Sequence, residues 1–193
     1  MKPLSVAAII LVSFLGVADA QSNPGQIWFE LPDQICTVGV PYVVKVHLNA
    51  GTQYPNSIQF NITFDNSQLE VAFSGPLPDL INADLALGQD LVDANIQDLM
   101  MNHRSTAPGV IEVSKSGAKV DGPWSITGDI ELMQITFHPK AETSETVING
   151  NIDPVIGLLD GDLEPIGTPE VVEPAFPIVI RRLPGPNVAH LLL

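Results

Sequence analysis

From Ser57 to Phe64, apolar and polar residues alternate without interruption, with every even position apolar and every odd position polar. Successive side chains of a β-strand point to opposite sides, so this pattern predicts a strand with one buried face and one face in water. The same period recurs along most of the chain. We therefore expect an all-β fold.

Eight other segments have the pattern of short strands. They span residues 27–31, 42–48, 69–73, 110–114, 130–138, 147–152, 155–159 and 176–180. The breaks between them carry turn-forming sequences, such as Pro108-Gly109 and Asp160-Gly161-Asp162. Many short strands separated by turns predict a sandwich or a barrel rather than alternating βα units.

One stretch departs from this period. Its apolar residues recur at intervals of three, four and seven, namely Ile81, Leu85, Val92, Ile96 and Leu99. We therefore expect a short helical insertion around residues 78–100, interrupted at Gly88, that caps the sandwich. In this interpretation the acidic residues of the segment form a solvated face, consisting of Asp79, Asp84, Asp90, Asp93 and Asp98.

The N-terminus has the layout of a secretory signal peptide. Lys2 precedes an apolar run over residues 6–17, and Ala18-Asp19-Ala20 follows as a cleavage site of small residues. The run is shorter than the roughly 20 residues that a membrane-spanning helix needs. We expect four parts in the chain, which are a signal peptide over 1–20, a short linker over 21–25, one domain over 26–180 and a C-terminal tail over 181–193.

The chain is strongly acidic, with 22 Asp and Glu against 8 Lys and Arg and a net charge of −14. Such a charge disfavours nucleic acids and anionic membranes as partners and suits a soluble extracellular protein. No later run is long and apolar enough to cross a bilayer, so we expect no membrane insertion of the mature chain.

Cys36 is the only cysteine in the sequence, which excludes an intrachain disulfide. It stands between the apolar residues Ile35 and Val38, in the sequence Ile35-Cys36-Thr37-Val38. We expect a buried, unreactive thiol.

Catalytic and metal-binding motifs do not emerge from the sequence. The four histidines, His47, His103, His138 and His190, lack the spacing of a zinc site, and no G-x-S-x-G sequence is present. Asp160-Gly161-Asp162 supplies alternating carboxylates, but a hairpin turn explains it better than a calcium loop. We expect no enzyme activity, no metal and no cofactor.

A sugar-binding protein needs exposed aromatic rings, and this chain offers few. Trp28 lies in an alternating strand and is expected in the core, whereas Trp124 follows the turn Asp121-Gly122-Pro123 and is the candidate for stacking on a sugar. Asn61-Ile62-Thr63 also fits the acceptor pattern for N-glycosylation.

Several segments, taken in order from Ile27 to Ile180, resemble a cohesin domain, which is a nine-stranded jelly roll of bacterial extracellular scaffold proteins. The resemblance rests on Thr37-Val38-Gly39, on the strand 57–64 leading through Asp65-Asn66-Ser67 into Leu69-Glu70-Val71, and on residues 126–137 and 158–166. It implies a nine-stranded jelly-roll β-sandwich of the cohesin type.

Cohesins bind dockerin modules through an exposed sheet face. The resemblance places the outward residues of the strand 57–64 on that face, namely Ser57, Gln59, Asn61 and Thr63. At the positions of Ser57 and Gln59 the sequence differs from the best-known dockerin binders, which carry an Asn and an Asp there.

Taken together, the signal peptide and the resemblance predict a secreted, non-catalytic module for protein assembly or adhesion, with a dockerin-like partner. The alternative is a carbohydrate-binding module with a polysaccharide partner, and an enzyme whose site is assembled only in three dimensions is the third hypothesis.

Overall fold

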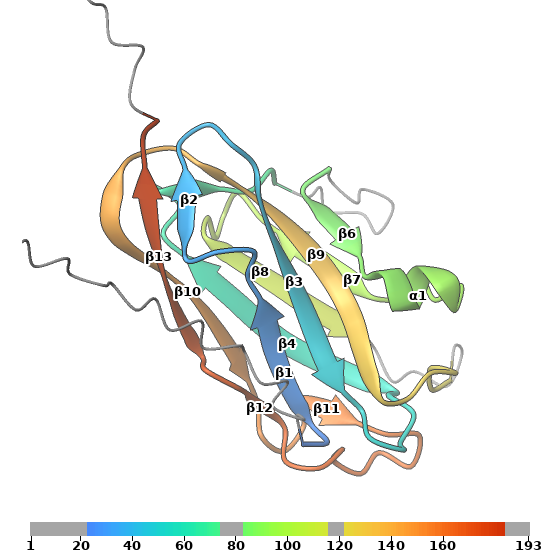
Figure 1. Cartoon of the computed structure of the whole chain (residues 1–193). Coiled ribbons are helices and arrows are strands. Elements are labelled where there is room, and N and C mark those ends of the chain that lie inside the picture. The colour runs from blue at the N-terminus through green and yellow to red at the C-terminus, as the bar shows by residue number, and fades with distance from the viewer. Residues whose placement is uncertain (1–22, 74–82, 116–121, 184–193) are drawn as a thin grey trace, which may run out of the picture.

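Two β-sheets pack face to face in the computed structural model, which describes residues 23–73, 83–115 and 122–183 (Figure 1). The signal peptide predicted over 1–20 and most of the predicted tail lie outside these residues. The first described strand starts at Gln26 and the last one ends at Arg181. This two-layer, all-β architecture is the sandwich that the alternating pattern predicts.

The first sheet has the strand order β12-β1-β3-β9-β5, and β6 also pairs with β9. Its strands are β1 (Gln26–Glu30), β3 (Tyr42–Asn49), β5 (Leu69–Glu70), β6 (Leu85–Leu87), β9 (Asp129–Pro139) and β12 (Glu170–Val171). The pairs are antiparallel except for β1 with β12.

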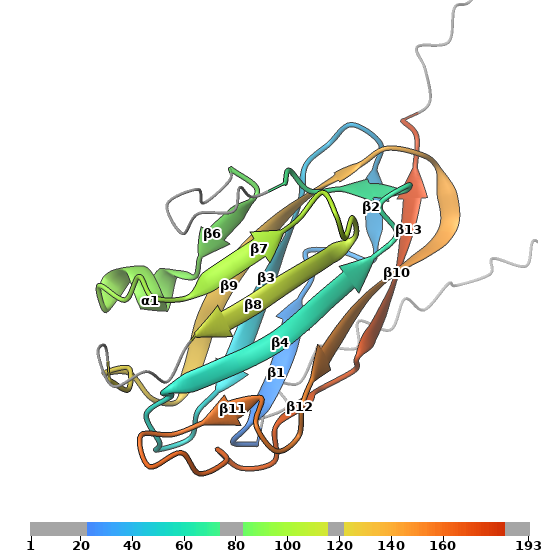
Figure 2. The ribbon, with the colours of Figure 1, turned by 180° about the vertical axis from the view of Figure 1, so that it is seen from behind.

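The second sheet has the order β2-β13-β10-β4-β8-β7, with β11 paired to β4. Its strands are β2 (Ile35–Thr37), β4 (Ser57–Phe64), β7 (Met100–His103), β8 (Val110–Lys115), β10 (Thr143–Ile152), β11 (Leu158–Leu159) and β13 (Ala175–Arg181). Only the pair of β13 with β2 is parallel. Figure 2 shows β7, β8, β4 and β10 side by side on the near side of the molecule.

The core lies between the two sheets and follows from the alternation. The even residues of β4, Ile58, Phe60, Ile62 and Phe64, are all buried. Phe64 meets Phe137 of the opposite sheet edge to face, with ring centroids 5.2 Å apart. Each buried aromatic ring of this kind removes a large apolar area from water, so these contacts hold the two layers together.

Gly150 of β10 shows how closely the sheets approach. A Cβ atom at this position would lie 2.8 Å from Phe29 and 2.8 Å from Val171, which both come from the first sheet. The missing side chain makes room for the Phe29 ring, which packs on Phe176 with ring centroids 4.8 Å apart. We therefore explain the break in the apolar pattern at residue 150 by packing across the sandwich.

The helical insertion expected around residues 78–100 is largely wrong. Within the described part of this segment, only α1 (Gln89–Asp93) is helical, and Leu85 lies in strand β6, paired with Ile135. Gly88 brings the chain so close to β9 that a Cβ would lie 1.8 Å from the Glu131 carbonyl oxygen. Of the apolar residues on which the prediction rested, Leu85, Ile96 and Leu99 are buried, whereas Val92 is 54% exposed and Ile81 lies outside the described residues.

The solvated acidic face predicted for this segment is wrong for several residues. Asp84 is buried and accepts hydrogen bonds from the Ala72 N–H and from His138. Asp90 and Asp98 also bond to other elements, as described below. Asp79 lies outside the described residues.

All nine predicted strand positions hold a strand, and three of the strands stop short of a predicted limit. Leu31 lies outside β1, and residues 71–73 and 155–157 lie outside β5 and β11. Four further short strands, β2, β6, β7 and β12, bring the number in the described residues to thirteen. Because they have two to four residues each, a period of two leaves no clear trace in their sequence.

We expect Phe60→Ala to lower the free energy of unfolding by about 3–5 kcal/mol, because it leaves a cavity between the sheets. Asn61→Ala on the same strand points outward and should change it by less than about 0.5 kcal/mol. Urea denaturation followed by tryptophan fluorescence measures both values. Similar losses for the two variants would contradict the predicted orientation of β4.

Candidate functional site

The outward side of β7, β8, β4 and β10 forms a broad surface, which we call the open face. None of the described elements covers it (Figure 2). The four residues singled out from the sequence all lie on it, with Gln59 and Asn61 exposed and Ser57 and Thr63 half-buried. The structure thus places these four side chains on one solvent-facing surface.

The register of the strands shows which residues lie beside them. Asn61 pairs with Glu112 of β8 on one side and with Asn151 of β10 on the other, and Glu112 in turn pairs with Asn102 of β7. This row crosses the whole open face. Gln59 pairs with Ser114, and Thr63 lies between Val110 and Asn149.

Sequence analysis missed the contributions of β7 and β10 to this surface. Asn149 and Asn151 are odd positions of an alternating segment, so the period of two was sufficient to place them outward. Asn102 and Met100 belong to the short strand β7, inside the segment interpreted as a helix. Their placement depends on pairing with β8, which no local pattern reveals.

Hydrogen-bonding amides rather than charges dominate the open face. Glu112 is paired with Arg104, whose Nη2 atom lies 2.9 Å from the carboxylate. Among the described residues near the centre of the face, the other outward polar groups of β4 and β8 are neutral, namely Ser57, Gln59, Asn61, Thr63 and Ser114. Such a surface offers many hydrogen bonds with a small desolvation cost.

A hollow of about 360 Å³ opens on this face beside β4. Gln59 and Asn61 line it from β4 and Asn151 from β10, and residues 152–154 and 156 close the far side. Ile156 is 56% exposed, so an apolar side chain stands next to the three amides.

Asp153 fixes the loop that closes this hollow. One of its carboxylate oxygens, Oδ1, accepts hydrogen bonds from the N–H groups of Val155 at 2.8 Å and Ile156 at 3.1 Å. These two bonds lower the pKa of Asp153 below its ordinary value. The carboxylate is therefore charged at neutral pH.

A buried ion pair holds the edge of the open face. The Lys115 side chain is fully buried at the end of β8, with its Nζ atom 2.7 Å from Asp98 Oδ2 and 3.1 Å from the Gly122 carbonyl oxygen. Trp124 donates a hydrogen bond from Nε1 to Asp98 Oδ1 at 2.7 Å. The network ties β8 to the loop before β7 and to the loop before β9.

This network corrects the prediction of a sugar-stacking aromatic. Trp124 is only 4% exposed, and its ring lies 5.8 Å from Lys115 Nζ. Pro123 before it is exposed, but the indole of Trp124 turns inward and donates its hydrogen bond to Asp98. Trp124 is thus unable to present a ring face to a sugar.

Trp28 is the opposite case, because the core position predicted for it is wrong. Its neighbours Ile27 and Phe29 are buried, whereas Trp28 is half-buried on the outer side of the first sheet. Its ring stacks on His47, with centroids 5.2 Å apart and an interplanar angle of 10°. His47 also bonds to Glu30 at 2.9 Å.

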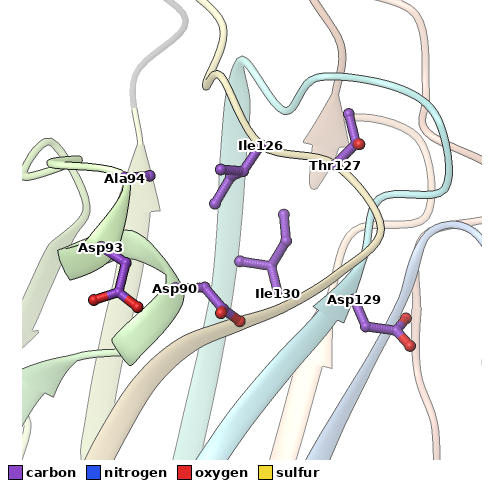
Figure 3. Close-up of a pocket in the computed structure, with 7 residues that line it drawn as sticks. All are labelled: Asp90, Asp93, Ala94, Ile126, Thr127, Asp129 and Ile130. Atoms are coloured by element: carbon purple, nitrogen blue, oxygen red, sulfur yellow. The ribbon is translucent and has the colours of Figure 1, made fainter.

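A second hollow of about 360 Å³ lies between α1 and the start of β9 (Figure 3). It is lined by Asp90, Asp93, Ala94, Ile126, Thr127, Asp129 and Ile130. Asp90 Oδ2 accepts a hydrogen bond from the Glu131 N–H at 2.7 Å, and Asp93 accepts one from Gln89. Figure 3 shows the Asp129 carboxylate pointing away from these two.

Within residues 23–73, 83–115 and 122–183, no group of three or more His, Cys, Asp or Glu side chains is arranged to hold a metal ion. The Asp160-Gly161-Asp162 sequence forms the predicted turn, because Leu159 pairs with Pro165 and Asp160 Oδ1 accepts the N–H groups of Asp162 and Glu164.

Cys36 is buried, as predicted, and this burial raises the pKa of its thiol, which opposes formation of the reactive thiolate. No helix in the described residues has the length and apolar character needed to span a membrane.

Comparisons with known proteins give matches at the level of structure. No protein-family model and no curated protein sequence matches the chain. The sixth cohesin of Acetivibrio cellulolyticus scaffoldin B, solved in complex with a mutant Cel5 dockerin, superimposes with a TM-score of 0.60 and 15% identity over 83% of this chain and 100% of that one. The chain has a cohesin fold.

Other solved cohesins agree with this assignment. The Coh-OlpC cohesin of Clostridium thermocellum, in complex with Doc435, gives a TM-score of 0.59 at 14% identity, over 86% of this chain and 99% of the other. A cohesin module from a family 33 glycoside hydrolase of Clostridium perfringens gives 0.55 at 12% identity, over 84% and 100%. These structures therefore share the cohesin fold with this chain at 12–15% sequence identity.

We expect Asp98→Asn to destabilise this cohesin fold by about 3 kcal/mol, because it leaves the buried Lys115 ammonium without its counter-charge. Asp93→Asn removes the same charge from an exposed position of α1 and should cost less than about 0.5 kcal/mol. Thermal or urea unfolding of the two variants at pH 7 gives the comparison. Equal stability of the two would show that the Lys115 ion pair does not hold the sheet edge.

Proposed function

We propose that this chain is a secreted, non-catalytic binding module that docks a folded protein partner of the dockerin kind on its open face. The observation that carries the proposal is the row Asn102-Glu112-Asn61-Asn151, which crosses an uncovered four-stranded surface. Backbone hydrogen bonds within the sheet hold these side chains in a fixed order, so a rigid partner can match them.

The composition of the open face supports a protein partner. Half-buried Val110 and exposed Met100 stand among the amides and supply apolar area, while the ion pair of Arg104 with Glu112 lies toward the β7 edge. Protein interfaces combine such apolar groups with a rim of hydrogen-bonding groups.

The solved relatives add support for the kind of partner. The Acetivibrio cellulolyticus and Clostridium thermocellum cohesins named above are complexes with dockerins. Ser57 and Gln59 stand where the best-known dockerin binders carry Asn and Asp, so the partner should differ in its contacts at this end of β4. A carbohydrate partner is not proposed, because the aromatic residue expected to bind it is buried.

Location outside the cell is part of the same proposal. The support is the sequence of residues 1–20, with Lys2, an apolar run and Ala18-Asp19-Ala20, which follows the order of a cleaved signal peptide. A lone buried cysteine means that the domain does not depend on a disulfide in that compartment.

We expect Thr63→Arg to weaken binding of a dockerin about tenfold or more, because it puts a long charged side chain in the centre of the open face. Thr136→Arg is the matched control, since Thr136 is also half-buried but lies on β9 in the other sheet. The measurement is a calorimetric titration of the full chain and each variant with two Clostridium thermocellum dockerins. These are Doc435 from the Coh-OlpC complex and Doc918, which was solved in complex with the Coh-OlpA cohesin.

Two outcomes of this titration would contradict the proposal. The first is a lack of binding of either dockerin to the unchanged chain. The second is an equal loss of affinity in Thr63→Arg and Thr136→Arg, which would place the interface away from the open face. Circular dichroism of both variants confirms that each one keeps its sheet content.

We expect expression of the full sequence in a secreting bacterial host to release a protein whose N-terminus is Gln21. The reason is that cleavage follows the small residues Ala18-Asp19-Ala20. Edman sequencing of the protein in the medium checks this position. Retention of an uncleaved chain in the cell would refute the secretory part of the proposal, and Ala18→Arg with Ala20→Arg serves as the negative control.

A further inference from the structure

We infer that the hollow beside Gln59 and Asn61 receives an arginine side chain of the partner. The inference rests on the proposed function, because it names the chemistry that the partner presents to the open face. Three features of the hollow support it, which are its unused amides, the fixed carboxylate of Asp153 and the apolar wall at Ile156.

Three of the side chains that line this hollow end in amide groups. Gln59, Asn61 and Asn151 all line the hollow, and no side chain or backbone group of the described residues forms a hydrogen bond with their amide groups. Each has a carbonyl oxygen that can accept two hydrogen bonds. The hollow therefore presents at least three acceptor oxygens from two neighbouring strands.

Among the described residues that line the hollow, Asp153 alone carries a carboxylate. Its Oδ1 atom is occupied by the Val155 and Ile156 N–H groups, which leaves Oδ2 available. Among the described residues, Asp153 takes part in no ion pair, so its carboxylate has no internal counter-charge there. A ligand that brings a positive charge would supply it.

The remaining wall is apolar. Ile156 is 56% exposed, and Pro154 beside it is also exposed. A long aliphatic stem that ends in a charged head would cover this wall while its head reaches the acceptors. Ile156 thus gives the hollow an apolar side that faces its polar groups.

Arginine matches these groups better than other side chains do. Its planar guanidinium has five N–H donors for the carbonyl oxygens of Gln59, Asn61 and Asn151 and for Asp153 Oδ2. A lysine ammonium has three donors on one atom and is more strongly hydrated, so it satisfies fewer of the acceptors at once. The net charge of −14 also draws a basic segment toward the module.

The second hollow provides an internal comparison. Asp90, Asp93 and Asp129 give it three carboxylates, against one in the hollow on the open face. If charge alone attracted the arginine, it would bind at the three carboxylates of the second hollow. If the amides and one carboxylate recognise it, it binds at the open face. The NMR titration described next separates these two explanations.

The test is an NMR titration of the 15N-labelled full chain with N-acetyl-arginine amide. Its neutral isostere, N-acetyl-citrulline amide, and N-acetyl-lysine amide are titrated in parallel. We expect saturable shifts of the side-chain NH2 signals of Gln59, Asn61 and Asn151 with the arginine probe. The citrulline and lysine probes should bind about fivefold or more weakly, since each loses either the charge or the planar donor set.

Asp153→Asn is the decisive variant, because the asparagine oxygen can still accept the Val155 and Ile156 N–H groups and keep the loop in place. We expect it to weaken the arginine probe about fivefold, the upper end for an exposed charge pair. Asp162→Asn makes the same change in the exposed loop after β11 and should leave the affinity unchanged.

Three results would overturn the inference. They are shifts confined to Ala94, Thr127 and their neighbours at the second hollow, equal affinities for arginine and citrulline probes, and equal effects of Asp153→Asn and Asp162→Asn. Because these probes contain no dockerin, the result is independent of the dockerin titration. Failure of the dockerins with success of the arginine probe would refute the proposed partner while keeping the arginine site.

Discussion

Two aromatic pairs that cross the space between the sheets determine much of this structure. Phe64 of β4 meets Phe137 of β9, and Phe29 of β1 meets Phe176 of β13. Each pair joins strands far apart in the sequence, so neither sheet can shift by one residue without exposing its aromatic rings. The fixed register of the core in turn fixes which side chains point outward.

The packing of the core thus determines which side chains form the open face. Because Phe60 and Phe64 face inward, Gln59, Asn61 and Thr63 must face solvent, and pairing with β8 and β10 sets their neighbours. The edge is stabilised differently, through the buried charge of Lys115. An apolar core determines the surface, and a single polar network keeps its outermost strands and loops in position.

Sequence reasoning was accurate where a pattern repeats over many residues. The limits of β4 were predicted to the residue, since eight alternating positions leave one solution. It failed for Trp124 and Leu85, whose environments depend on Asp98 and Ile135 from distant segments. The four β4 residues of the open face followed from local periodicity, whereas the hollow needs a loop, residues 152–156, that only the assembled sandwich brings beside them.

The outward position of Asn61 has a practical consequence. It begins the sequence Asn61-Ile62-Thr63, and its exposed side chain lies in the middle row of the open face. A eukaryotic secretory host recognises this tripeptide and attaches a branched oligosaccharide to such an asparagine. Protein produced in yeast or mammalian cells would carry an N-linked oligosaccharide that covers part of the open face. The choice of expression organism therefore decides whether the open face is accessible.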